Sequence, residues 1–251
     1  MRIYALHIYV PKGLSVNLIM KRMNNEAYIE QYKSFIYRQE YPCVAAKEAV
    51  RKQRVKVFVA GHMACPKDDR AILDFMYNFV DEYRSSGDFF HSAAIIFPSH
   101  DTIPSEEMFE NMLFQRLQSL ADMGGQEYAY DKRVSSDPTS RAFSFSIKEE
   151  AFYIIGLHPN SSRAARRFEH PTMVFNPHQQ FEVLRSTHRY EKMKNIVRKL
   201  DTAYSGSVNP MLQDFGNSPE VFQYSGRKVD QSWQCPLKIN NYIKGEQHPT
   251  T

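Results

Sequence analysis

Cysteine is scarce in this 251-residue chain, and long apolar runs are missing from it. The three cysteines, Cys43, Cys65 and Cys235, are odd in number and far apart. This usage argues against a disulfide framework and indicates a reducing compartment. No stretch approaches the roughly 20 apolar residues of a membrane span, and the N-terminus lacks the apolar region and cleavage site of a signal peptide. We therefore expect a soluble, cytoplasmic protein with no membrane partner.

Several motifs of enzyme chemistry are also missing. The chain has neither G-x-x-x-x-G-K-[ST] nor G-x-G-x-x-G, so no loop predicts a nucleotide cofactor. It has no G-x-S-x-G nucleophile motif. Cys43, His62 and Cys65 offer metal-binding side chains, but no second close pair completes a zinc site, and Cys43 is better interpreted as a small buried side chain. The nine scattered histidines leave a non-haem iron site open.

What the chain does contain is a packed core and a regular alternation of elements. Hydrophobic residues make up 42% and aromatic residues 13% of it. Apolar periodicity predicts helices over 17–38, 72–83 and 109–120, with Ser105 capping the last of these. It predicts strands in RVKVFVAGHM and SAAIIFP, and a β-hairpin in AFSFSIKEEAFYIIGLHP. PTMVFNPHQQ reads as an extended link before one long helix, FEVLRSTHRYEKMKNIVRKL. We expect a single α+β domain over 1–251, with a core of about 17–240 and a mostly antiparallel sheet flanked by amphipathic helices.

The stretch GLHPNSSRAARRF places one histidine at a strand end, just before a dense arginine cluster. Arg163, Arg166 and Arg167 are spaced to share one face of a short helix. A haem requires an axial imidazole, an apolar slot and cations for its propionates, and His158 with these arginines could supply the first and last. Spacing alone favours a non-ligating histidine.

Positive charge is concentrated after this motif. From Arg163 to Lys199 there are nine Lys/Arg and three Asp/Glu, a local balance of +6, whereas the whole chain carries +4. Such a region predicts an anionic partner: a phosphate, a carboxylate or a nucleic acid. On charge alone a solvated helix face is the simpler interpretation. A nucleic-acid-binding module is unlikely because no recognised motif accompanies the charge.

The segment from Gly206 onward has little periodicity but is rich in polar and aromatic side chains. Long irregular segments of this kind are often ordered against a core and form sites, although a structural wrap around the domain explains them equally well. The candidate binding residues here are Asn209, Asp214, Glu220, Gln223, Tyr224 and Arg227.

Four motifs in order carry a resemblance to a known family. They are YPCVAAK, GLHPNSSRAARRF, MVFNPHQQFEVLR and SVNPMLQDFG…QYSGR…WQCP, and the match runs from about Tyr41 to Leu237. The chain resembles the YqcI/YcgG family. Members with an assigned function are haem-dependent N-hydroxylases, among them the arginine hydroxylase of the D-cycloserine pathway and the pre-guanitoxin N-hydroxylase.

The resemblance implies an enzyme that uses haem b, dioxygen and an electron donor, such as a reductase or a ferredoxin-like protein, to oxidise a guanidine or amine nitrogen of a small molecule. We assign His158 as the axial iron ligand, with Cys235 as the competitor, and Arg163, Arg166 and Arg167 as propionate partners. Asp214 and Glu220 are the expected clamps for a charged substrate head. Asn209, Gln223, Tyr224 and Arg227 are expected to line the substrate side. A non-catalytic haem-binding or haem-sensing protein remains the alternative.

Overall fold

A computed structural model describes residues 16–98, 105–209, 216–230 and 232–240 of the chain. Its elements follow in an irregular order of helices and strands. In chain order the elements are α1 (Val16–Tyr37), α2 (Val44–Arg51), β1 (Val55–Val59), the 3-10 turn η1 (Pro66–Asp68), α3 (Asp69–Ser86), β2 (Ser92–Ile96), α4 (Glu106–Gly124), β3 (Phe145–Ile147), β4 (Glu150–Leu157), η2 (Ala164–Arg166), β5 (Thr172–Pro177), α5 (His178–Ser186), α6 (Tyr190–Ser205) and η3 (Glu220–Gln223).

The five strands form one mixed sheet in the order β1-β2-β5-β4-β3. Only β1 and β2 pair in parallel, and the other three pairings are antiparallel. The expected α+β class with a mostly antiparallel sheet is therefore confirmed.

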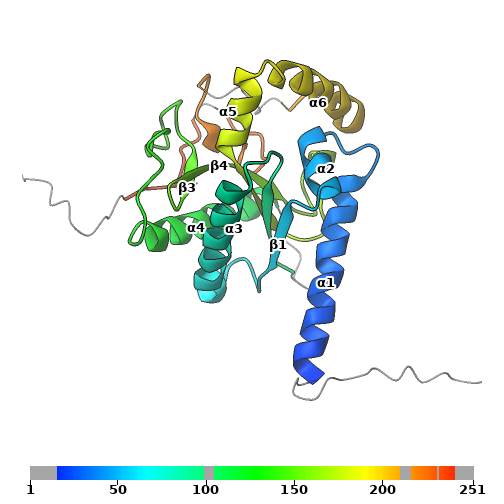
Figure 1. Cartoon of the computed structure of the whole chain (residues 1–251), viewed down its shortest axis with the longest axis vertical. Coiled ribbons are helices and arrows are strands. Elements are labelled where there is room, and N and C mark those ends of the chain that lie inside the picture. Colours follow the sequence, from blue (N-terminus) through cyan, green and yellow to red (C-terminus); the bar gives the residue numbers. More distant parts are fainter. Residues whose placement is uncertain (1–15, 99–104, 210–215, 231, 241–251) are drawn as a thin grey trace, which may run out of the picture.

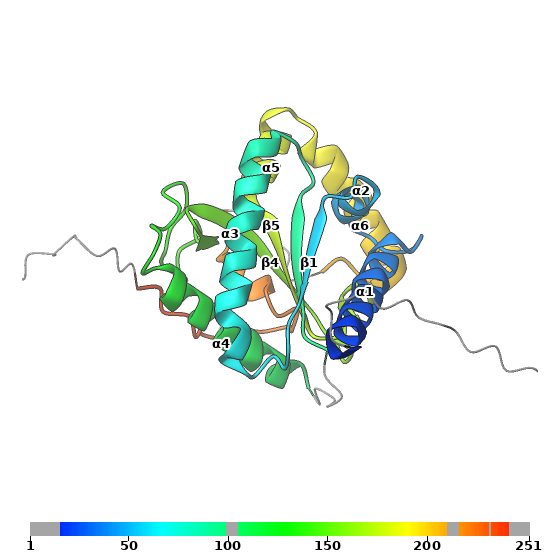
Figure 2. The same ribbon diagram turned by 60° about the horizontal axis from the view of Figure 1, so that its bottom comes forward.

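Helices cover both faces of this sheet. Figure 1 shows α3 and α4 on one side of the strands and α1 and α2 on the other, and Figure 2 shows α6 on the same side as α1 and α2. The strands are buried on both faces, so alternate residues serve two cores. Ile95, Phe152 and Phe175 pack toward α3 and α4 in the larger cluster. Ala94, Leu157 and Val174 belong to the smaller cluster around α1. This alternation follows from the two-residue repeat of a strand.

Local signals in the sequence predicted several elements correctly. The Ser105 side chain accepts the Met108 backbone N–H at 3.1 Å and caps α4, as expected. The predicted hairpin is β3–β4, and its turn residues Lys148 and Glu149 both have positive φ, 52° and 57°. Positive φ at both central positions is the geometry of a tight two-residue hairpin turn.

Two predictions of local structure were wrong. PTMVFNP is no link: as β5 it lies at the centre of the sheet, between β2 and β4. The single long helix is two helices, α5 and α6, separated at Thr187–Arg189, where His188 has a φ of 56°. A residue in the left-handed region cannot continue a right-handed helix, so the chain changes direction there.

Candidate functional site

His158 follows β4 directly and faces α4. Ile155 and Leu157 point toward α1, α2 and α6, so the alternate positions Gly156 and His158 point to the opposite face. The His158 ring is fully buried and stacks on Phe109 of α4, with centroids 4.3 Å apart and an interplanar angle of 22°. Neither ring nitrogen has a hydrogen-bond partner among the described residues. Desolvation by burial lowers the pKa of His158 to about 4, so the ring is neutral at physiological pH.

Glycine at position 156 makes room for this stack. A Cβ there would lie 2.6 Å from Cε1 of Phe109 and 2.8 Å from the Tyr224 carbonyl oxygen. The Gly156 backbone N–H donates to that same carbonyl at 2.7 Å. The exposed edge of β4 beyond β3 is thus covered by the segment that carries Tyr224.

Two of the four motifs that carry the family resemblance, GLHPNSSRAARRF and QYSGR, contact each other through Arg166. Its Nη1 donates to the Tyr224 carbonyl at 3.1 Å and to the Gly156 carbonyl at 3.4 Å. Gly226 has a φ of +85°, and a Cβ there would meet Arg166 Cδ at 2.6 Å. The glycine of the QYSGR motif therefore leaves space for Arg166 of the GLHPNSSRAARRF motif.

The three arginines do not share one helix face, and this expectation was wrong. The segment forms only the 3-10 turn η2, and each arginine has different surroundings. Arg163 Nη2 pairs with Asp201 Oδ2 of α6 at 2.7 Å. Arg166 is buried, whereas Arg167 is exposed and donates to the Ser161 and Ser162 carbonyls. The turn covers only Ala164–Arg166, and the backbone is extended at Arg163 and has left the helical region at Arg167, so no helix carries all three side chains. Their role as propionate partners stays a prediction.

A cavity of about 250 Å³ lies on the opposite face of the sheet from His158, beneath α2, α5 and α6. Its floor is built from strand residues whose side chains face away from α3 and α4: Val55, Ser92, Tyr153, Ile155, Val174 and Asn176. Within this floor Val55 pairs with Ser92, and Tyr153 pairs with Asn176. The volume is slightly below the roughly 300–1,000 Å³ of typical ligand pockets, which suits a small metabolite.

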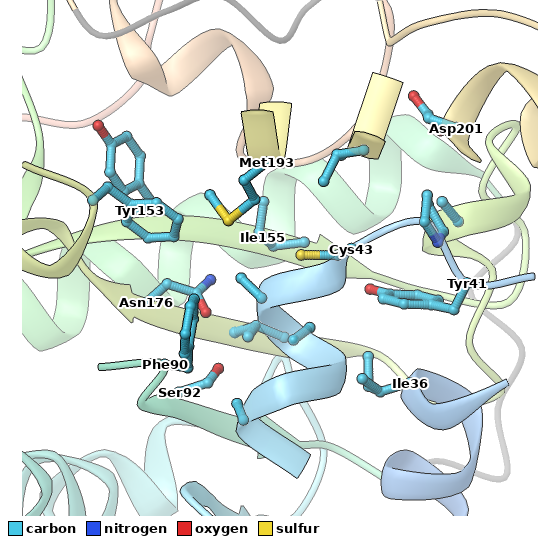
Figure 3. Close-up of a pocket in the computed structure, with 18 of the residues that line it drawn as sticks. Ile36, Tyr41, Cys43, Phe90, Ser92, Tyr153, Ile155, Asn176, Met193 and Asp201 are labelled. Atoms are coloured by element: carbon cyan, nitrogen blue, oxygen red, sulfur yellow. The ribbon is translucent and has the colours of Figure 1, made fainter. Parts of the chain in front are cut away.

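The cavity is elongated, with different chemistry at its two ends. Figure 3 shows Tyr153, Asn176, Phe90 and Ser92 at one end and Tyr41 and Asp201 at the other. Cys43, Ile155 and Met193 lie between them and make the middle largely apolar (Figure 3). Burial raises the pKa of both the Tyr41 hydroxyl and the Cys43 thiol, so both are neutral.

Part of the positive charge that the sequence concentrates after position 163 surrounds this cavity. Four of its nine basic residues line the cavity: Arg163, Arg166, Arg185 and Lys194. They are accompanied by one lining carboxylate, Asp201. Fewer than half of these basic residues thus line a pocket, and that part of the charge favours a small anionic ligand over an extended nucleic acid.

The candidate residues of the C-terminal segment are divided between the two faces. Asn209 and Gln223 line the cavity together with Arg163 and Arg166, so the structure brings four of the predicted residues together there. Tyr224 is buried on the α3–α4 side, where its hydroxyl accepts the Phe145 N–H at 3.1 Å. Arg227 pairs with Glu110 of α4 at 2.5 Å. Asp214 lies outside the described residues.

Glu220 and Cys235 occupy apolar surroundings that favour their neutral forms. Burial raises the pKa of Glu220 well above its usual range, and the Ser144 and Tyr224 hydroxyls oppose this shift only in part. Burial likewise raises the pKa of Cys235 to about 11. Cys235 packs against the α3–α4 core and does not line the cavity. A protonated thiol is a poor iron ligand, so the surroundings favour His158 over Cys235.

Residue-by-residue reasoning missed most of the cavity. Tyr41, Cys43 and Asn176 lie within the motifs YPCVAAK and MVFNPHQQ. These family motifs were the sequence signal from which the three cavity residues could have been identified. Asp201, Arg185 and Lys194 come from α5 and α6, where helical periodicity gives no sign of a cavity.

Within the described ranges, no group of three or more histidine, cysteine, aspartate or glutamate side chains could hold a metal ion. None of the described helices is long and apolar enough to cross a membrane.

Comparison with known proteins places the chain in a family. The family model described as the YqcI/YcgG family matches residues 32–238, which is most of the chain, and the protein belongs to that family. No curated protein and no solved structure matches the chain.

Proposed function

We propose that this protein is a cytoplasmic haem-dependent N-oxygenase that acts on a small metabolite bearing a guanidine or amine nitrogen. Membership of the YqcI/YcgG family and the resemblance to haem-dependent N-hydroxylases support the proposal. The observation that carries it is the state of His158: a fully buried, neutral imidazole whose two ring nitrogens have no hydrogen-bond partner among the described residues. Buried polar groups are almost always hydrogen-bonded, so an orphaned imidazole is a candidate for a ligand role.

His158 fits an axial iron ligand in three respects. An iron ligand must be the neutral imidazole, and burial keeps the ring neutral. The ring plane is held by the Phe109 stack, and the His158 backbone N–H is anchored to the Arg166 carbonyl at 3.0 Å. Because the ring is enclosed, side chains around it must move when haem binds. We therefore expect a higher haem content when haem is supplied while the chain folds than when it is added to the folded protein.

When bound, haem supplies the iron centre at which dioxygen is reduced with electrons from a reductase or a ferredoxin-like donor. The chain's own residues hold the ring of His158 and exclude water from it. Among the predicted carboxylate clamps, Glu220 is buried and favoured in its neutral form, and Asp214 lies outside the described residues. Asp201 lines the cavity on the opposite face of the sheet and pairs with Arg163, so it is not placed to hold a substrate nitrogen beside an iron bound to His158.

The proposal is tested by expressing the full chain with haem supplementation and measuring haem content and the Soret band. We expect a Soret band in the wild type, loss or a shift of that band in His158→Ala, and a wild-type band in His170→Ala. His170 is a suitable control because it is partly buried and its ring contacts Gln31 at 3.2 Å, on the α1 side. The absence of haem from the wild type would overturn the proposal.

Turnover separates an enzyme from a haem-binding or haem-sensing protein. The loaded protein is incubated with a reductant, dioxygen and a panel of guanidines and amines, and N-hydroxylated products are measured by mass spectrometry. Product formation that is lost in His158→Ala supports the N-oxygenase. If the haem-loaded protein converts no compound of the panel, the result would contradict the catalytic role and support a haem-binding or haem-sensing role.

A further inference from the structure

Arg166 is a buried cation without a carboxylate partner. It is only 6% exposed, and its Nη1 donates to two backbone carbonyls, those of Gly156 and Tyr224. Desolvation lowers its pKa to about 10. No ion pair involves Arg166 within the described ranges, whereas Arg163 pairs with Asp201, Arg185 with Glu182 and Lys194 with Glu191. A buried charge without a counter-ion is costly, so its retention beside a cavity indicates an anion that binds there.

Gln223 adds a second unsatisfied group at the same cavity. Its side chain is only 5% exposed and lines the cavity, and its carbonyl oxygen Oε1 has no hydrogen-bond partner in the part of the chain that the structure describes. An orphaned acceptor of this kind is satisfied when a ligand donates a hydrogen bond to it. Arg166 and Gln223 thus offer a ligand one cation and one acceptor.

The Arg166 charge acts at the Tyr41 end of the cavity. The hydroxyl of Tyr41 lies close enough to Arg166 for each to shift the pKa of the other. Tyr41 lies at the same end as Asp201, across the apolar middle from Asn176 and Ser92 (Figure 3). A ligand with one anionic end and an apolar chain matches this arrangement, because Cys43, Ile155 and Met193 line the space between the ends.

We propose that this cavity is a binding site for a small organic monocarboxylate, with Arg166 as its counter-ion and the apolar middle as the seat of its chain. Asp201 and Glu106 favour the Arg166 charge only at longer range, and no carboxylate of the described residues forms an ion pair with it. A single cation without an ion pair matches one negative charge, which favours a carboxylate over a phosphate dianion. A planar guanidinium also matches the two oxygens of a carboxylate. The site lies across the sheet from His158, and the inference does not rest on the haem-dependent function.

The carboxylate could belong to a free metabolite or to a haem propionate, and the test distinguishes these sources. Hexanoate and hexanamide, which differ in charge but little in size, are titrated by calorimetry into the haem-free full chain. We expect hexanoate to bind at least tenfold more tightly than hexanamide. Arg166→Met should weaken hexanoate binding at least tenfold and leave hexanamide unchanged. If the site binds the carboxylate of a free metabolite, haemin leaves hexanoate binding unchanged. If the site instead binds a haem propionate, haemin competes with hexanoate, whereas haemin dimethyl ester, which has no free carboxylate, does not compete.

Two further variants keep the test decisive. Arg167→Met makes the same change at a neighbouring exposed arginine that does not line the cavity, and should leave hexanoate binding unchanged. Ala46→Leu fills part of the cavity from α2 without touching the Arg166 hydrogen bonds, and should weaken both probes together. Arg166→Met could unfold the chain, and Ala46→Leu then still reports on the site. Equal binding of hexanoate and hexanamide, or hexanoate binding that survives both cavity variants, would overturn the proposal.

Discussion

His158 shows at the scale of one residue how burial and function conflict. A buried imidazole with no hydrogen-bond partner costs roughly 1–3 kcal/mol of folding free energy relative to a satisfied one. Its spacing ahead of the arginines by itself favoured a non-ligating histidine, and the family resemblance led us to assign it as a ligand. The structure adds an observation that no sequence pattern contains, namely that both ring nitrogens lack a hydrogen-bond partner among the described residues. The position of the histidine at the end of β4 was predictable from the hairpin. The Phe109 stack was not, because it joins residues that are distant in the chain.

The lowered pKa of His158 predicts a loss of stability in acid. The usual pKa is 6.5 and the folded value is about 4, so between these values the unfolded chain binds the extra proton. The free energy of unfolding should therefore fall as the pH drops from about 6.5 to about 4, by about 3 kcal/mol from this residue. His158→Phe keeps an aromatic ring against Phe109 and should remove this part of the decline. His178, whose pKa is also lowered to about 4, should account for a remaining part.

Urea denaturation of the haem-free protein at pH values from 7.5 to 4 measures this effect. His62→Phe, the same substitution at an exposed histidine, serves as the control and should follow the wild-type curve. If His158→Phe loses as much stability between pH 6.5 and pH 4 as the wild type does, the buried neutral imidazole is not the cause.

At the scale of elements, α4 holds the irregular C-terminal segment through one buried carboxylate. Glu110 accepts hydrogen bonds from Ser225 Oγ at 2.7 Å, Arg227 Nη2 at 2.5 Å and Trp233 Nε1 at 3.1 Å. The segment in turn places Gln223 at the cavity and the Tyr224 carbonyl against Arg166. The segment is thus a structural wrap that also positions a cavity residue, and its binding role stays a prediction.

Replacing Glu110 by Gln should loosen this segment. The amide leaves the Arg227 charge without its partner, and breaking such a pair should lower the free energy of unfolding by roughly 2–4 kcal/mol. Trp233 is the only tryptophan of the chain, so its fluorescence reports directly on the segment. Glu107→Gln removes the same charge from an exposed position on α4 and should have little effect. Unchanged stability and unchanged tryptophan emission in Glu110→Gln would show that the segment is held by other contacts.

Elements with a clear local signal were predicted, including β1 and β2, whose partners are distant in the chain, whereas elements without such a signal were not. The α4 cap and the β3–β4 hairpin depend on neighbouring residues. Strand β5 depends on pairing with β2 and β4, and its flanking prolines hid it in the sequence. The break between α5 and α6 contains neither proline nor glycine, so no local signal announced it.

At the scale of the whole molecule, the sheet separates two candidate sites. His158 faces α4, whereas the cavity with its cationic lining faces α2, α5 and α6. The sequence predicted Arg163, Arg166, Asn209 and Gln223 as binding residues, and all four line the cavity. The location of the cavity could not be predicted, because its walls come from both halves of the chain and meet only when the sheet is assembled.

The most direct test of the account is chemical rescue of the iron ligand. His158→Gly is expressed with haem, and its visible absorption spectrum is recorded before and after addition of imidazole, beside the wild type and Cys235→Ala. We predict that the variant has an altered Soret band, that imidazole restores the wild-type position, and that Cys235→Ala retains the wild-type spectrum throughout. A wild-type spectrum in His158→Gly without imidazole would contradict the assignment of His158 as the haem ligand.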